Sequence, residues 1–272
     1  MTSIGAGAFY YCSGLTSVTI PNSVTTIGNQ AFDHCFGLTS VNISDVAAWC
    51  NIKFECDPIY SCLSNPLSHA QHLYLNGEEI KDLVIPNSVT SIGEYVFYCF
   101  SGFTSVTIPN SVTRIGKYAF LGCSGLTAVH ILDLEAWCKI SFSSGSNPLS
   151  HAQHLYLNGE EIKNLVIPNR VTRIEDYAFY GCSGLTSVDV PNSVKSIGEY
   201  AFWGCSGLTS LTISNSVMSI GKSAFYDCSV LTSVTIGSGI KNIYSHAFAS
   251  CLELTDVYCY AVKVPNTETD AL

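Results

Sequence analysis

An isoleucine followed by an Ala-Phe pair recurs along this chain every 23 residues, and this repeat constrains the fold more than any other feature. The pattern Ile-Gly-x-x-Ala-Phe returns with small variations, and two longer gaps interrupt it. The stretch TSVTIPNSV even occurs letter for letter at 16–24 and 104–112. A fixed period in the twenties is the signature of a solenoid of stacked coils. The isoleucines of the pattern are Ile4, Ile27, Ile92, Ile115, Ile174, Ile197, Ile220 and Ile243.

One 23-residue coil reads as two short extended sides joined by turns. Apolar and hydroxylated residues alternate over 17–20, which predicts a strand with one buried face. Pro21 ends this strand because proline cannot donate the next ladder hydrogen bond. Ile27 then lies on a second short extended side, and Ala31 and Phe32 point inward from a single helical or 3₁₀ turn. One coil cannot cover its own apolar edge, so neighbouring coils stack into a parallel sheet.

Two segments, 44–82 and 132–164, are longer than one coil and predict elaborated coils that bulge from the stack. Asp45 suits the N-cap of a short helix, and Asn76-Gly77 suits the type I′ turn of a β-hairpin. The seventeen residues NPLSHAQHLYLNGEEIK occur identically at 65–81 and 147–163.

Each elaborated coil carries an HxxH pair and two adjacent glutamates. On a helix, histidines three residues apart share a face and can bind a metal, but no third ligand lies nearby. We therefore interpret these histidines as surface or packing residues, and the glutamates as a solvated hairpin edge. The residues concerned are His69, His72, His151, His154, Glu78, Glu79, Glu160 and Glu161.

Thirteen cysteines are present, and most of them follow the repeat. Because equivalent residues of stacked coils form a row, we interpret the repeated cysteines as buried thiols that act as small apolar residues. Cys50 and Cys138 follow a tryptophan and are also expected in the core. Cys56 and Cys62 flank an insertion, where a local disulfide and two free thiols are both possible. The repeated cysteines are Cys12, Cys35, Cys123, Cys182, Cys205, Cys228 and Cys251.

The sequence contains none of the signatures of an enzyme. HExxH, GxSxG, a glycine-rich phosphate loop and paired CxxC motifs are missing. Catalysis needs one unique constellation, whereas nearly every polar residue here has copies in other coils. We therefore expect no catalytic residues, no metal and no cofactor.

Charge and hydropathy exclude several partners. The formal net charge is −9, only 12% of the residues are charged, and no basic cluster occurs. Nucleic acid and anionic membranes both need a basic face, so neither is expected as a partner. No apolar run is long enough for direct membrane insertion.

The chain begins and ends within its own repeat. We interpret it as a fragment of a longer protein, with no signal peptide in this chain. We expect a monomer apart from end-to-end contacts at uncapped ends, because stacked proteins need polar caps there.

Two sets of surface residues are candidate binding sites. The outward positions of the main strands form a flat, mostly hydroxylated face that suits an extended partner, although these residues would also keep the face soluble. The aromatic row that follows the Ala-Phe pairs could bind glycan rings, or its rings could stack and stabilise the coils. The strand-face candidates are Asn42, Thr107, His130, Asp189, Thr212 and Tyr258, and the alternative aromatic row is Tyr180, Trp203 and Tyr226.

The unit of hydrophobic strand, Pro-Asn, Val-x-x-Ile-Gly-x-x-Ala-Phe-x-x-Cys-x-x-Leu resembles the BspA-like leucine-rich-repeat family over essentially the whole chain. The resemblance implies a right-handed leucine-rich-repeat solenoid. Members are typically large surface or secreted proteins of mouth and gut bacteria and of some mucosal protists. They are associated with adhesion to host matrix proteins such as fibronectin and fibrinogen, and with cell–cell attachment. The family has no compact site motif from which binding residues can be transferred.

Together, these observations predict one mainly β solenoid over residues 1–272, with about ten coils, a parallel sheet and short helical turns. The expected function is that of a non-enzymatic, cell-surface or secreted adhesion scaffold that binds extracellular or host-surface proteins. A glycan-binding module and a passive structural spacer remain the alternatives.

Overall fold

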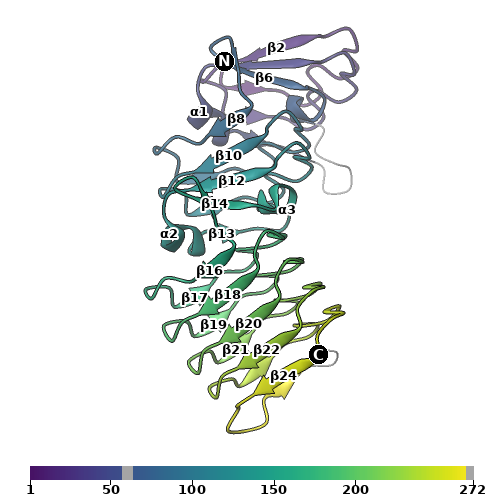
Figure 1. Ribbon diagram of the computed structural model, residues 1–272. Coiled ribbons are helices and arrows are strands. Elements are labelled where there is room, and N and C mark those ends of the chain that lie inside the picture. The colour runs from purple at the N-terminus through teal and green to yellow at the C-terminus, as the bar shows by residue number, and fades with distance from the viewer. Residues whose placement is uncertain (57–63, 268–272) are drawn as a thin grey trace. The chain divides into compact units, whose positions relative to one another are not determined.

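The computed structural model describes residues 1–56 and 64–267 (Figure 1). The chain forms two compact units, and each is described by itself. Unit 1 comprises Met1–Val129 and Ser143–Ala152, and unit 2 comprises His130–Phe142 and Gln153–Leu272.

In unit 1, successive coils contribute parallel strands to two kinds of ladder. Val18, Val41 and Leu73 are paired across three main strands, so the same side of each strand enters the core. The main strands are β2 (Ser17–Ile20), β4 (Ser40–Ile43) and β6 (His72–Leu75), and then β8 (Asp82–Val84) with β10 (Ser105–Ile108). The short strands are β1 (Ser3–Ile4), β3 (Thr26–Ile27) and β5 (Lys53–Phe54), and then β9 (Ser91–Ile92) with β11 (Arg114–Ile115).

Unit 2 contains the longest uninterrupted ladders, in which five main strands and five short strands each pair in parallel. The main strands are β16 (Asn164–Val166), β18 (Ser187–Val190), β20 (Ser210–Ile213), β22 (Ser233–Ile236) and β24 (Asp256–Cys259). The short strands are β17 (Arg173–Ile174), β19 (Ser196–Ile197), β21 (Ser219–Ile220), β23 (Asn242–Ile243) and β25 (Asn266–Thr267). Two further strands are β12 (Ala128–Ile131), in a plain coil, and β13 (Ser141–Phe142), in the second elaborated coil. These ladders confirm the predicted parallel stack.

The repeated phenylalanines form a buried row, as predicted. Phe179, Phe202 and Phe225 are fully buried, and the centroids of successive rings lie 5.1 Å apart. Phe248 continues the row 5.2 Å beyond Phe225. Each ring therefore covers the face of its neighbour, and the core runs from coil to coil.

The Ala-Phe segment is not the helical or 3₁₀ turn expected from the sequence. It is a run of tight turns in which two residues per coil have positive φ, for example Tyr200 (55°) and Gly204 (69°). The N–H groups of Tyr200, Phe202 and Gly204 therefore point away from their own turn. They donate to carbonyl oxygens of the following coil at 2.9, 2.7 and 2.8 Å. A third backbone ladder between coils replaces the hydrogen bonds that a helix would make internally.

The short helices of the elaborated coils begin where the sequence predicts. Helix α1 (Val46–Cys50) is capped by Asp45, whose carboxylate accepts from the N–H groups of Ala47 and Ala48 at 2.7 and 3.2 Å. Helix α2 (Leu134–Cys138) is capped by Asp133 in the same way. Each helix buries one tryptophan in its own unit.

Both predicted hairpins are present, one in each unit. Strand β6 pairs with β7 (Glu78–Glu79) in unit 1, and β14 (Leu155–Leu157) pairs with β15 (Glu160–Glu161) in unit 2. Asn76 and Gly77 have φ of 52° and 91°, as a type I′ turn requires. Short helices precede both hairpins, and these are η1 (Pro66–Ser68) and α3 (Leu149–Ala152). The sequence reading missed that β6 is also the main strand of its coil, in parallel register with β4.

The repeated cysteines are buried in the inner coils, as expected, but their thiols also make hydrogen bonds. Cys205 Sγ donates to the carbonyl oxygen of Phe179 at 3.3 Å, and Cys228 Sγ to that of Phe202 at 3.5 Å. Cys12 is exposed and Cys251 is partly exposed. A purely apolar side chain would leave the buried carbonyl without this donor. Among the other cysteines, Cys50 and Cys138 are in the core, Cys56 is disulfide-bonded, and Cys62 lies outside the described residues.

Thiol alkylation will separate the cysteines by their depth. Burial raises the pKa of Cys205 well above its ordinary value and that of Cys182 to about 12, and the thiolate is the reactive species. At pH 8 we expect iodoacetamide to modify the exposed Cys12 and Cys259 but leave Cys182 and Cys205 unmodified. Peptide mass spectrometry of the folded chain, with a denatured sample as control, measures this. Alkylation of Cys205 as fast as that of Cys259 would contradict the buried row.

Candidate functional site

The main-strand face of unit 2 carries three of the candidate binding residues in one row. Asp189, Thr212, Thr235 and Tyr258 are paired in sequence across four neighbouring strands. Asp189 and Thr212 are exposed, and Tyr258 is 52% exposed. The alternate positions of β18, β20 and β22 point into the core and are buried. The outward side chains therefore stand on a well-packed sheet with regular spacing.

A ladder of threonines borders this face and ties the coils together. The hydroxyl group of Thr209 donates to the carbonyl oxygen of Thr186 at 3.1 Å. In the same way, the hydroxyl group of Thr232 donates to the carbonyl oxygen of Thr209 at 3.1 Å, and that of Thr255 to the carbonyl oxygen of Thr232 at 3.3 Å. The hydroxyl groups of these threonines, each directly before a main strand, therefore have a structural role. They are already hydrogen-bonded to the backbone, unlike the outward hydroxyl group of Thr212.

The other strand-face candidates lie outside this row: Asn42 is on β4, whereas Thr107 on β10 and His130 on β12 belong to one other sheet. In unit 1, Asn42 is in register with Tyr74 and donates to Ser17 Oγ at 3.0 Å. Thr107 is half-buried and pairs with Val84 on β8. In unit 2, the ring of His130 lies 5.0 Å from that of Tyr156 on β14. Asn42 and His130 thus each lie beside a hairpin tyrosine that the sequence analysis did not select.

The alternative aromatic row is engaged in stacking. The rings of Tyr180 and Trp203 are 4.7 Å apart and 7° from parallel, and those of Trp203 and Tyr226 are 6.0 Å apart and 3° from parallel. A sugar ring binds an aromatic side chain through its open face. Both faces of Trp203 are occupied by its neighbours, so this geometry favours the stabilising role over the glycan-binding one.

The hairpins bring together a histidine, a glutamate and a tyrosine. His72 Nδ1 lies 2.7 Å from Glu79 Oε1, and His154 Nδ1 lies 2.6 Å from Glu161 Oε1. The hydrogen bond from His72 lowers the pKa of the Glu79 carboxyl group below its ordinary value. The hairpin glutamates are exposed, or partly exposed in the case of Glu161, as expected of a solvated edge. Glu79 and Glu161 are in addition each hydrogen-bonded to a histidine. In the sequence, the one feature that pointed to these histidine–glutamate pairs was the identity of the two seventeen-residue segments that contain them.

The histidines of each HxxH pair do not share a helix face. His72 begins β6, whereas His69 follows η1. In the second copy, His151 lies on α3 and its Nε2 accepts the N–H of Gly122 at 2.9 Å, while His154 lies beyond the helix. Burial lowers the pKa of His69 and His151, which favours the neutral ring. Among the described residues, no group of three His, Cys, Asp or Glu side chains is arranged to hold a metal ion.

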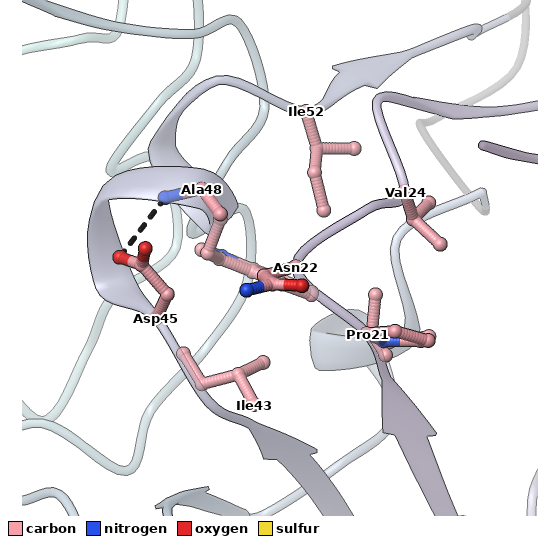
Figure 2. A pocket seen from close by; sticks show the side chains of 9 residues that line it. Pro21, Asn22, Val24, Ile43, Asp45, Ala48 and Ile52 are labelled. Carbon is pink, nitrogen blue, oxygen red and sulfur yellow. Dashed lines mark hydrogen bonds between the residues drawn. The ribbon is translucent and has the colours of Figure 1, made fainter. Parts of the chain in front are cut away.

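A small hollow lies in unit 1 between the Pro-Asn turn and helix α1 (Figure 2). It has a volume of about 170 Å³, part of which is open solvent, whereas ligand pockets typically reach about 300–1,000 Å³. Its one carboxylate, that of Asp45, is turned toward the N–H of Ala48 in its own helix (Figure 2). The hollow is therefore too small for a typical ligand site.

No helix in the described part of the chain is long and apolar enough to cross a bilayer. The face of the main strands and the two hairpins are the candidate sites.

Comparison with known proteins agrees with the repeat. The family model described as BspA type leucine-rich repeat region (6 copies) matches residues 1–66, 68–153 and 150–266. A leucine-rich cell surface protein from Faecalibacterium prausnitzii is 26% identical, with 95% of this chain and 83% of that chain covered and a TM-score of 0.47. A leucine-rich-repeat protein from Bacteroides ovatus is 24% identical, with 94% and 76% covered and a TM-score of 0.48.

The pneumococcal vaccine antigen PcpA is 16% identical, with 94% of this chain and 71% of that chain covered and a TM-score of 0.54, a likeness of fold alone. No curated protein matches the chain. The repeat unit, the parallel ladders and the family match over almost the whole length lead to one conclusion: the chain belongs to the BspA-type leucine-rich-repeat family.

Proposed function

We propose that this chain is a non-enzymatic interaction scaffold of a secreted or cell-surface protein, and that the main-strand face binds a protein partner such as a host matrix protein. The observation that carries the proposal is the row of Asp189, Thr212, Thr235 and Tyr258 on the five-stranded ladder of unit 2. Under Asp189, Thr212 and Thr235 the opposite side of the sheet is buried, whereas β24, which carries Tyr258, is exposed on both sides. Such a surface loses little conformational freedom when it binds, so contacts made there contribute to affinity with a small entropic cost.

Membership of the family supports the compartment, because its members are typically surface or secreted proteins. The repeated architecture also supports a scaffold, since the polar residues that vary from coil to coil lie on the surface while the core positions repeat. Solenoids use such extended surfaces for binding.

The test measures binding of the purified chain to immobilised fibronectin and fibrinogen by surface plasmon resonance. Asp189→Arg together with Thr212→Arg places two long charged side chains on the strand face, and we expect at least about tenfold weaker binding, equivalent to about 1.4 kcal/mol. Glu199→Arg, an exposed change on the turn side of the coil, is the matched control and should leave binding unchanged.

Equal loss in both variants, or full binding by the strand-face variant, would overturn the proposed surface. The proposed partner class would be overturned if the unaltered chain bound neither protein. It would also be overturned if the chain bound only to a glycan array.

A further inference from the structure

The two hairpin segments are more alike than their surroundings. Residues 65–81 and 147–163 are identical at all positions, whereas the seventeen residues that follow each segment differ at six positions. The differing pairs are Asp82 and Asn164, Ser88 and Arg170, Ser91 and Arg173, Gly93 and Glu175, Glu94 and Asp176, and Val96 and Ala178. Five of these six changes alter a polar or glycine position, so the surface of the plain coils varies while that of the hairpins does not.

Packing accounts for only part of this identity. Asn65 and Leu73 are fully buried, and Gly77 needs its positive φ. Tyr74 is half-exposed and Lys81 is exposed, yet both are the same in the other copy. Exposed positions away from special features usually tolerate change within about 0.5 kcal/mol of stability. Stability therefore sets only a weak constraint on the exposed Lys81 and a partial one on Tyr74, and a contact with another molecule would account for both side chains.

The ring and the carboxylate of each hairpin are cross-strand partners. Tyr74 pairs with Glu79 in the antiparallel register of β6 and β7, and Tyr156 pairs with Glu161 in that of β14 and β15. Directly paired residues project to the same side of the sheet. The histidine hydrogen bond occupies one oxygen of each carboxylate. The second oxygen of Glu161 lies 3.6 Å from Lys163 Nζ, and a long ion pair with an exposed lysine is weak enough for a partner's cation to replace.

From this arrangement, and building on the proposed function, we propose that the two hairpins are equivalent binding elements, one in each unit, which recognise arginine side chains of an extended basic segment of the protein partner. A guanidinium group stacks on a tyrosine ring and donates to a neighbouring carboxylate at the same time. Asn42 beside Tyr74 and His130 beside Tyr156 extend the two elements onto the main-strand face. The formal charge of −9 and the lack of a basic cluster in the sequence complement a cationic segment.

The test uses the full chain and an acetylated, amidated octapeptide of alternating arginine and serine. Alternation places all the arginines on one side of an extended peptide. Isothermal titration calorimetry should give two peptides per chain. Tyr74→Ala with Glu79→Gln should give one peptide per chain with unchanged affinity at the remaining element. The same changes at Tyr156 and Glu161 in addition should abolish binding.

Controls separate recognition from general charge attraction. Glutamine keeps an oxygen that accepts from the histidine, so the hairpin fold is preserved, and circular dichroism checks this. Glu199→Gln removes one negative charge from an exposed site away from the hairpins and should leave both sites intact. A glutamate-serine octapeptide should not bind. Equal weakening by Glu199→Gln, a stoichiometry other than two, or binding of neutral oligosaccharides in place of the peptide would overturn the proposal.

The two proposals fail in distinguishable ways. If the hairpin variants bind the matrix proteins as well as the unaltered chain does, while the Asp189→Arg and Thr212→Arg variant does not, the strand-face function stands and the hairpin inference is wrong. If the octapeptide binds with two sites but no matrix protein binds, the hairpins stand and the partner class is wrong.

Discussion

Replacing Phe202 by alanine will lower the free energy of unfolding by about 3–5 kcal/mol. Its ring is fully buried and stacks on Phe179 and Phe225 at 5.1 Å on either side. Truncation removes both contacts and leaves a cavity within a stack whose backbone is held by three ladders, so the coils cannot close the space. Chemical denaturation followed by circular dichroism measures the change.

Thr212→Ala is the matched control for Phe202→Ala. Thr212 is exposed on the main-strand face of the same unit, and Thr212→Ala should change the free energy of unfolding by no more than about 0.5 kcal/mol. If Phe202→Ala were as mild as this control, the row of phenylalanines would not be the core of the coils.

Asn65→Ala will cost about 2–5 kcal/mol, because it removes three hydrogen bonds from a fully buried side chain. The N–H of Leu67 is left unsatisfied, at about 1–3 kcal/mol, and each of the two other lost hydrogen bonds contributes about 0.5–1.5 kcal/mol, since their carbonyl oxygens keep other donors. Asn65 Nδ2 donates to the carbonyl oxygens of Tyr95 and Val96 at 2.7 and 3.0 Å. Its Oδ1 accepts the N–H of Leu67 at 2.9 Å. This amide therefore connects the elaborated coil to the turn of a plain coil in unit 1.

The control for this change is Asn42→Ala. Asn42 Nδ2 makes one hydrogen bond, to Ser17 Oγ, at a site that water can reach. We expect a loss below about 1 kcal/mol there, since a solvent-accessible hydrogen bond contributes little net stability. Similar losses in the two variants, measured by the same denaturation experiment, would contradict the buried role of Asn65.

The candidate sites were less predictable than the fold. Phase along the repeat placed Asp189, Thr212 and Tyr258 outward, and the register of the strands then set them in one row. Tyr74 and Tyr156 were not selected, because they lie in segments that break the 23-residue spacing. Counting in steps of 23 residues therefore cannot assign positions in these segments. β6 had to be recognised as a main strand before its outward residues could be assigned.

The aromatic row illustrates a different difficulty. Spacing alone put Tyr180, Trp203 and Tyr226 one coil apart, and both a binding and a stacking role were consistent with that spacing. The angles between the rings distinguish the two roles, since near-parallel rings with centroids 4.7 and 6.0 Å apart stack on each other's faces.

The amino-acid sequence by itself determined the coil length, the main strands, the buried phenylalanine row and the capped helices. These follow from local patterns, namely period two in a strand, proline and glycine at turns, and identical residues at equal intervals. The tertiary structure alone decided the left-handed turns of the Ala-Phe segment, the thiol donor to the phenylalanine carbonyl and the histidine–glutamate pair of each hairpin. Each of these depends on which backbone group of another strand or coil comes within hydrogen-bond distance, and that distance exists only once the coils have stacked.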